Sequence, residues 1–200
     1  MKQVLLFRHG QSILNLGLAA EDYRLAPLTE EGVRQAEQAS RDLPFEPELI
    51  VSSPYRRTVQ TAEPIRKRFP QAKWELWDEL HEFTYLEPAS CTGLTRDDRR
   101  PRSRAYWQAT DPEYVDGEGA ESFRMLMHRA DIVLERLQGR KESRIIVVSH
   151  EQFIKAFLMT LHGRDEDMTK AMRQFKKTPA VGNCEAIPVE LSQSSIQVTF

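Results

Sequence analysis

Three short apolar runs, set far apart along this 200-residue chain, constrain its fold more than any other feature. They are QVLLF (residues 3–7), LIVSS (49–53) and RIIVVS (144–149). Continuous apolar runs of this length, rich in leucine or β-branched residues, are typical of strands that are buried on both faces of a parallel sheet. Helical patterns lie between them. The sequence therefore predicts an α/β fold with an open, mainly parallel sheet that is flanked by helices on both faces.

Helix signals follow each strand. Thr29 is a suitable N-cap for an acidic first turn, and Pro44 closes the helix that it starts. Apolar residues at helical spacing predict three further helices, and Gly163 ends the last of them. The chain then finishes in EAIPVEL and SIQVTF, which we expect to form a hairpin. The four helices are expected over residues 30–43, 55–69, 121–137 and 153–162.

No linker or repeat divides the chain, so we expect a single domain over residues 1–200. Between residues 84 and 119 the periodicity fails, and aromatic residues, prolines and arginines mix. We interpret this segment as a lid-like insertion over the strand ends, with one short helix near RSRAYWQA (102–109).

Composition and charge exclude several classes of protein. Cys91 and Cys184 are the only cysteines, and no basic leader or apolar run of ~20 residues occurs, so we expect a reduced, cytoplasmic protein without a membrane partner. A formal net charge of −2 gives no attraction to nucleic acid. The one basic cluster, RDDRRPRSR (96–104), is interpreted as solvated surface or as a contact for anionic substrates.

Polar side chains stand where two of the predicted strands end. Arg8 and His9 follow the first strand, and Ser149 and His150 end the last. The carboxyl ends of parallel strands form the edge where ligands bind, so the two imidazoles are expected to face one another. A single histidine at such a place is more often structural. The pair with an adjacent arginine indicates a site for chemistry.

The middle strand leads into SSPYRRTVQTA, where Arg56 and Arg57 fall in the first turn of a helix. Cations there oppose the helix dipole unless an anion lies between them, which points to phosphate. The alternative, that both arginines project into solvent, stays open at this point.

Six motifs, in this order and spacing, resemble the histidine phosphatase superfamily, whose branches include the cofactor-dependent phosphoglycerate mutases. They are RHGQSILN, PLTEEGVRQAEQA, SSPYRRTVQTA, ELHEF, GAESF and VVSHEQFIKAFL. The resemblance runs from about residue 7 to residue 158. It implies a phosphoglycerate mutase-like fold and phosphoryl transfer through a histidine.

The resemblance also implies roles for individual residues. It makes His9 the nucleophile and Glu82 the acid, with Glu79 as a competing candidate for the acid. It assigns the second phosphate-binding arginine to Arg57 rather than Arg56. The implied phosphate-binding residues are Arg8, Asn15, Arg57 and His150.

These roles fit the chemistry of phosphoryl transfer to a neutral imidazole, which needs the phosphate charge neutralised and the leaving oxygen protonated. Arg8, Arg57 and a protonated His150 would meet the first need, and Glu82 the second. No histidine or cysteine pair has metal-ligand spacing, and no glycine-rich nucleotide motif occurs, so we expect neither a metal nor a nucleotide cofactor.

Three departures from the family pattern leave the substrate open. Leu25 stands where aspartate is frequent, Glu151 replaces the glycine that usually follows the second histidine, and TYLEP replaces Gly-x-Trp-Glu-Gly after the acid. The leading hypothesis is a phosphatase that acts on a small phosphorylated substrate through a phosphohistidine. A phosphoglycerate mutase-type transfer and a non-catalytic phosphate- or phosphopeptide-binding module are the alternatives. The oligomeric state is not predicted.

Overall fold

The structure, a computed structural model, describes residues 1–192 and has within them one five-stranded sheet in the order β3-β2-β4-β1-β5. Neighbouring strands from β3 to β1 are parallel, and β5 is antiparallel to β1. The three predicted strands are the three central ones, and the predicted open, mainly parallel sheet is confirmed. The strands are β1 (Lys2–Arg8), β2 (Leu49–Ser52), β3 (Lys73–Leu76), β4 (Arg144–Ser149) and β5 (Ala186–Leu191).

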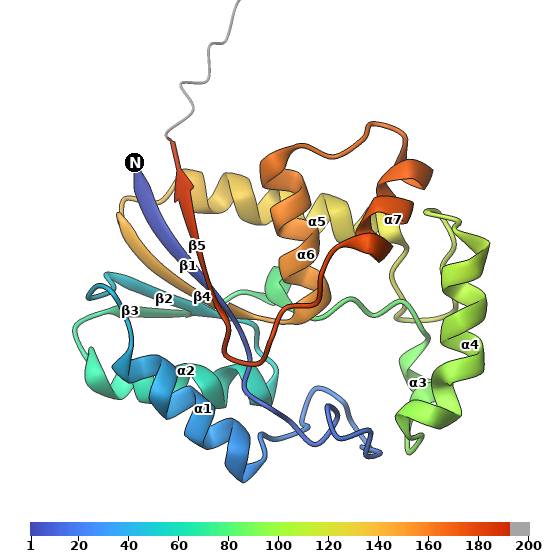
Figure 1. Ribbon diagram of the computed structural model, residues 1–200, viewed down its shortest axis with the longest axis horizontal. Coiled ribbons are helices and arrows are strands. Elements are labelled where there is room, and N and C mark those ends of the chain that lie inside the picture. Colours follow the sequence, from blue (N-terminus) through green and yellow to red (C-terminus); the bar gives the residue numbers. More distant parts are fainter. Residues whose placement is uncertain (193–200) are drawn as a thin grey trace, which may run out of the picture.

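Helices cover both faces of the sheet, as predicted (Figure 1). Helices α1 (Glu30–Arg41) and α2 (Arg56–Arg68) lie on one face, with α5 (Phe123–Gln138) and α6 (Glu151–His162) on the other. The side chains of β1 alternate between the two layers: Leu5 and Phe7 pack with α2, and Val4 and Leu6 join the core that includes α5 and α6. Burial on both faces explains why the middle of β1, residues 4–7, holds only apolar side chains.

The local signals that start and end the helices act as expected. The Thr29 hydroxyl accepts a hydrogen bond from the Gly32 amide at 3.1 Å, and α1 ends at Arg41, before Pro44. Helix α2 runs through Pro64. Helix α6 ends just before Gly163, whose φ of +88° lies in the left-handed region that glycine adopts without strain.

The insertion is more regular than predicted. Besides the short α3 (Pro88–Cys91), it holds the 14-residue helix α4 (Arg96–Ala109), which begins six residues before the expected short helix. Thr95 and Asp98 form a capping box that starts α4. The apolar periodicity is nearly absent because Tyr106 is the only fully buried side chain of the helix, and Pro101 obscures the pattern further.

Other elements were not predicted, and one prediction falls partly outside the described residues. Strand β3 is an edge strand of mixed polarity, so its pattern is weak. The sequence analysis also missed helix α7 (Met168–Lys177), which packs against α6. The first half of the predicted closing hairpin forms β5, and its second half lies outside residues 1–192. Within those residues no helix is long and apolar enough to span a membrane.

Candidate active site

The two histidines predicted to face one another leave the sheet side by side. Arg8 of β1 is in register with Ser149 of β4, and the His9 amide donates to the Ser149 carbonyl at 3.0 Å. The rings of His9 and His150 meet edge to face, with their centroids 5.2 Å apart. Both side chains are almost fully buried. The shared edge of two parallel strands therefore brings together residues that are 141 positions apart in sequence (150 − 9).

A close approach of two backbones explains the glycine that follows His9. A Cβ atom at Gly10 would lie 2.5 Å from the Gly32 carbonyl oxygen in the first turn of α1. A Cβ atom at Gly32 would lie 2.0 Å from the Gln11 carbonyl oxygen. Neither position has room for a side chain, so the loop after β1 is held against α1, and this fixes the direction in which His9 leaves the strand.

Arg57 lies between the two histidines. Its Nε donates to His9 Nε2 at 3.1 Å, and its Nη2 donates to His150 Nδ1 at 3.1 Å. Its Nη1 donates to the Tyr23 carbonyl at 2.7 Å. The side chain is 3% exposed, and burial lowers its pKa to about 10, so it remains a cation at neutral pH. Arg56 is exposed. The structure thus places Arg57, and not Arg56, at the predicted site.

The contacts of His9 define its tautomer. Its Nδ1 lies 2.7 Å from the Gly10 carbonyl oxygen, which can only accept, so Nδ1 carries the proton. Nε2 then holds a lone pair, and it accepts from Arg57. Burial, and next the charge of Arg57, lower the pKa of His9 well below its usual range. His9 is therefore a neutral imidazole with a nucleophilic Nε2 directed at the arginine.

His150 has the opposite tautomer. Because its Nδ1 accepts from Arg57, its Nε2 carries the proton and donates to the Ser53 hydroxyl at 2.9 Å. Burial, followed by the charge of Arg57, lowers the pKa of His150 well below its usual range. In the structure His150 is therefore neutral, which differs from the protonated form expected from the sequence, because its Nδ1 accepts from Arg57. Here His150 orients Arg57, and Ser53 orients His150. The sequence analysis did not single out Ser53.

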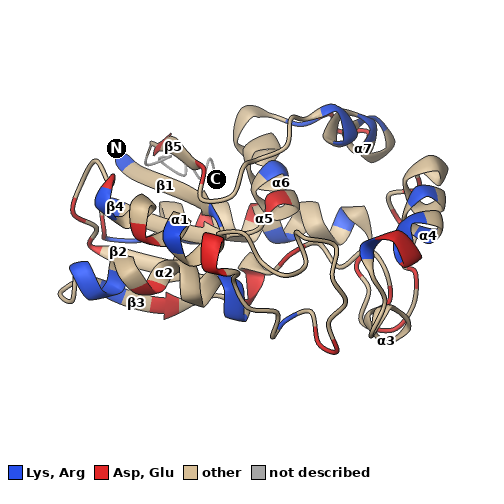
Figure 2. Ribbon diagram, turned by 60° about the horizontal axis from the view of Figure 1, so that its bottom comes forward, with Lys and Arg blue, Asp and Glu red and all other residues tan. Residues whose placement is uncertain are grey.

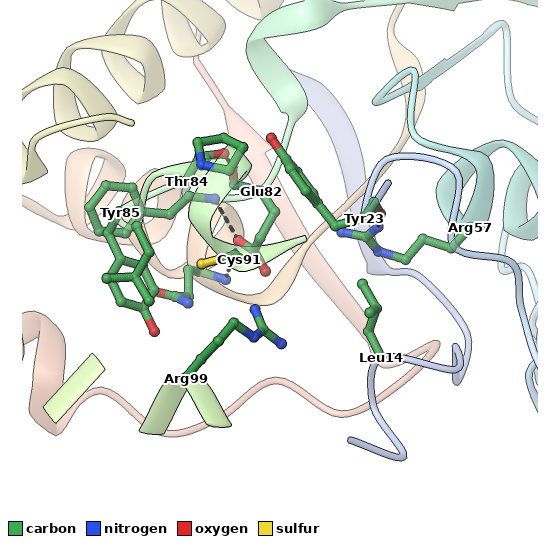
Figure 3. Close-up of a pocket in the computed structure, with 12 residues that line it drawn as sticks. Leu14, Tyr23, Arg57, Glu82, Thr84, Tyr85, Cys91 and Arg99 are labelled. Carbon is green, nitrogen blue, oxygen red and sulfur yellow. Dashed lines mark hydrogen bonds between the residues drawn. The ribbon is translucent and has the colours of Figure 1, made fainter. Parts of the chain in front are cut away.

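Glu82 caps helix α6 from a different part of the chain, and Figure 3 shows it near Tyr23 and Tyr85. Its Oε1 accepts from the amides of Phe83 at 2.9 Å, Gln152 at 3.2 Å and Phe153 at 3.3 Å. Removal from water raises the pKa of Glu82, and this effect outweighs the opposing pull of the Phe83 amide and Arg57. With Oε1 held by three donors, Oε2 is the oxygen available to carry a proton.

A buried ion pair holds the loop that carries Glu82. Arg129 binds both carboxylate oxygens of Glu121, at 2.9 and 2.8 Å, and donates to the carbonyls of Glu79 and His81 at 2.7 Å each. Glu121 in turn accepts from the Thr84 amide at 3.1 Å. These bonds fix the backbone on both sides of Glu82. The sequence analysis quoted GAESF only as a family motif, so these contacts were not predicted.

The competing acid Glu79 is directed elsewhere. Its carboxylate pairs with Arg136 of α5 at 3.1 Å, and it does not line the cleft that contains His9 and Arg57. Its location supports the choice of Glu82.

Asn15 lines the cleft and also shapes the loop after β1. Its Oδ1 accepts from the amide and the hydroxyl of Ser12, at 2.9 and 3.0 Å. Asn183, which the sequence analysis missed, donates to the His9 carbonyl at 2.9 Å and approaches Asn15 Oδ1 at 3.4 Å. Asn15 therefore supports the loop that carries His9.

Arg8 and Glu151 face the same cleft, which has a volume of about 650 Å³. Arg8 Nη1 pairs with Glu151 Oε2 at 3.0 Å and also donates to the Val181 carbonyl. The buried Arg8 Nε has no partner among the described residues. The lining of the cleft also includes Arg96, Arg99 and Arg100 of α4, which shows as a charged helix in Figure 2. Part of the basic cluster thus lines the cleft, and the cleft suits an anion. Among residues 1–192 no group of three or more metal-ligating side chains occurs.

Comparison with known proteins identifies the family. The model of the histidine phosphatase superfamily (branch 1) matches residues 4–191, and the chain belongs to this superfamily. A 2,3-bisphosphoglycerate-dependent phosphoglycerate mutase of Methylorubrum populi is 29% identical over 175 residues, which are 80% of this chain and 79% of that protein. A probable phosphoglycerate mutase of Yersinia pestis is 27% identical over 198 residues, 97% of this chain and 87% of that one.

Other relatives are longer or more distant. Human 6-phosphofructo-2-kinase/fructose-2,6-bisphosphatase 4 is 23% identical over 98% of this chain, which spans only 41% of that protein's length. A mycobacterial glucosyl-3-phosphoglycerate phosphatase, solved with VO3, has a TM-score of 0.73 at 25% identity and covers 95% of this chain and 91% of its own. The α-ribazole phosphatase of Shigella flexneri has a TM-score of 0.76 at 19% identity, and the match covers 96% of this chain and 91% of that one. It shows the shared fold.

The position of Arg57 gives a prediction about anion binding. Arg57→Ala should weaken the binding of phosphate or vanadate by roughly 10- to 100-fold, because a buried, charged donor is lost. Arg56→Ala is the matched control and should change the dissociation constant little, since Arg56 is exposed. Titration calorimetry measures both. Equal losses in the two variants would show that Arg57 has no special role in anion binding.

The pair of Arg8 with Glu151 gives a second prediction. Glu151→Gln removes a negative charge beside the phosphate site and frees Arg8, so inhibition by inorganic phosphate should tighten by roughly 3- to 10-fold. Glu79→Gln, which alters a carboxylate paired outside the cleft, is the control. An inhibition constant that is unchanged or weaker in Glu151→Gln would mean that Glu151 does not oppose the anion.

Proposed function

We propose that this protein is a phosphoric monoester hydrolase that acts on a small phosphorylated substrate through a phosphohistidine at His9. The observation that carries the proposal is the state of His9: a buried, neutral imidazole whose Nε2 lone pair faces the cation Arg57. A bound phosphoryl group would replace the histidine nitrogens as the acceptor for Arg57. It would then lie within reach of the nucleophile.

The first half of the proposed reaction forms the phosphoenzyme. His9 Nε2 donates its electron pair to phosphorus while the bond from phosphorus to the ester oxygen breaks. Glu82 gives its proton to that oxygen, so a neutral alcohol leaves. Arg57 and Arg8 stabilise the charge on the phosphoryl oxygens. The bond from His9 Nδ1–H to the Gly10 carbonyl supports the positive charge that the ring acquires.

The second half returns the enzyme to its starting state. The Glu82 carboxylate accepts a proton from water as the water oxygen bonds to phosphorus. The bond between phosphorus and His9 Nε2 breaks, and inorganic phosphate is formed. Each group is then in its initial protonation state, because Glu82 has recovered the proton that it donated.

A mutase-type transfer is the second candidate, because two of the relatives are named phosphoglycerate mutases. Two features favour hydrolysis. The segment after Glu82 reads TYLEP, where the mutases of the family share Gly-x-Trp-Glu-Gly. Glu151 also compensates part of the charge of Arg8, which makes the site less suited to a bisphosphorylated ligand.

The products distinguish these functions. With a chromogenic aryl phosphate, a phosphatase releases phenolate and inorganic phosphate in equal amounts, and a non-catalytic binding module releases neither. With a phosphoglycerate as substrate, a phosphatase liberates inorganic phosphate, and a mutase yields the isomer without net release. Phosphate release from at least one ester supports the proposal, and isomerisation without release contradicts it.

A further inference from the structure

A second, smaller cavity opens beside Glu82. It has a volume of about 180 Å³, and neither Arg8 nor His9 lines it. It adjoins the larger cleft, and the residues that line both are Leu14, Arg57, Glu82, Tyr85, Leu86, Arg99 and Gln152. Figure 3 shows Glu82 between Tyr85 and Cys91 on one side and Tyr23 and Arg57 on the other. Apart from Arg57, Glu82 and Arg99, no charged side chain among the described residues lines this cavity.

Two aromatic side chains that are fixed by their neighbours wall the cavity. The Tyr85 hydroxyl lies 2.8 Å from the Ser103 hydroxyl, and the Tyr85 ring packs 4.9 Å from Tyr106 and 5.5 Å from Phe83, between centroids. On the other side, the Tyr23 ring packs 5.6 Å from Tyr55. The walls are thus in place before a ligand arrives, which lowers the entropy cost of binding.

The position of the cavity relative to the reacting groups decides which part of a substrate enters it. In the proposed reaction the ester oxygen lies between the phosphorus atom at His9 and the proton of Glu82. The alcohol carbon and its substituents must then lie beyond that oxygen, away from His9. The small cavity is lined by Glu82 and not by His9, so it lies on the alcohol side.

We propose that this cavity binds the alcohol part of the substrate and selects one aromatic ring. The inference rests on the proposed phosphatase function and specifies its substrate class. An enclosed apolar cavity of ~150 Å³ is enough to hold benzene, so a volume of about 180 Å³ gives room for one aromatic ring. The guanidinium of Arg99, at the rim, can lie against the face of a planar ring.

A comparison of two esters tests the selection. Benzyl phosphate and ethyl phosphate are both alkyl esters with poor leaving groups, so they differ mainly in the ring. We expect kcat/KM for benzyl phosphate to exceed that for ethyl phosphate by roughly 10- to 100-fold, mostly through KM, because the ring is buried. Equal values, or a preference for ethyl phosphate, would overturn the inference while leaving the phosphatase function intact. If neither ester nor an aryl phosphate is hydrolysed, the proposed function itself fails.

A variant that fills the cavity sharpens the test. Cys91→Phe places a ring inside the cavity and should reduce the benzyl preference to near unity. Ala89→Phe, on the exposed side of the same short helix, is the matched control and should keep the preference. A preference that survives in Cys91→Phe would contradict the assignment of this cavity.

A binding measurement needs neither turnover nor a folded variant. The probes are benzylphosphonate and methylphosphonate, which cannot be hydrolysed. We expect the native protein to bind the benzyl compound roughly 10-fold more tightly or better by calorimetry. Equal dissociation constants would overturn the inference even if the protein is only a binding module.

Discussion

Replacing His9 by alanine should reduce phosphate release by roughly 10⁴-fold or more with every ester, since removing a nucleophile eliminates the covalent route. The lone pair of His9 Nε2 accepts a hydrogen bond from Arg57. The other histidine of the site, His150, cannot take its place, because its Nδ1 accepts from Arg57 and its Nε2 is protonated. No other described side chain is placed to replace it. Initial rates of phosphate release measure the effect.

The control for this variant is His128→Ala, which removes an exposed histidine on α5 and should leave the rate unchanged. Circular dichroism should show that His9→Ala remains folded, because Arg57 loses only one of three acceptors. A folded His9→Ala protein that turns over at a rate near that of the native enzyme would refute the role of His9.

Replacing Glu82 by glutamine should slow the reaction of esters with poor leaving groups much more than that of esters with good ones. Glutamine keeps an oxygen that can accept from the amides of Gln152 and Phe153, but it cannot deliver a proton. Hydrolysis of alkyl phosphates should therefore fall by roughly 10²- to 10⁴-fold, while formation of the phosphoenzyme from activated aryl phosphates, whose phenols leave without help, should fall much less. Rates for a series of esters with different leaving groups measure the contrast.

Glu79→Gln is the matched control, since it alters a carboxylate three residues away that pairs with Arg136. Its alkyl ester activity should stay near the native rate. If Glu79→Gln destroyed that activity and Glu82→Gln spared it, Glu79 would be the acid and the assignment of Glu82 would be wrong.

The pH dependence of phosphoenzyme formation follows from the carboxyl group of Glu82. Because the pKa of Glu82 is raised, its acid form persists to higher pH than that of an ordinary carboxyl, and it is lost as the pH rises through its pKa. Phosphoryl transfer from alkyl esters should decline on that basic side, and transfer from activated aryl esters should lack the decline. The low pKa of His9 keeps the nucleophile neutral on the acidic side. Single-turnover rates across pH test both statements.

The residues that sequence analysis predicted best are those governed by local rules. The three central strands were predicted because strands that are buried on both faces need uninterrupted apolar residues. The meeting of His9 with His150 followed from one rule, that parallel strands end at a common edge. Thr29 acts through its hydroxyl on the adjoining turn and Gly163 through its own backbone, so both effects could be predicted without knowledge of the fold.

The features that sequence analysis missed depend on contacts between distant segments. Arg57 was predicted in preference to Arg56, but only from the family motif, because the choice between them depends on helix rotation, which no local rule sets. The neutral state of His150 follows from its burial beside Arg57. The clamp of Glu121 and Arg129 on the Glu82 loop joins three segments, and no spacing rule predicts such a contact.

The most direct test of the account is to trap the phosphoenzyme. In Glu82→Gln, an activated aryl phosphate should still phosphorylate the enzyme, but the base that activates water is gone, so the intermediate should accumulate. Quenching in base, followed by peptide mapping by mass spectrometry, should find one phosphoryl group on His9. The label should be lost in acid, as a phosphoramidate is, and absent when His9→Ala is added. A phosphoryl group that survives acid or lies on another residue, or rapid turnover with no label, would contradict the central claim that His9 carries the phosphoryl group.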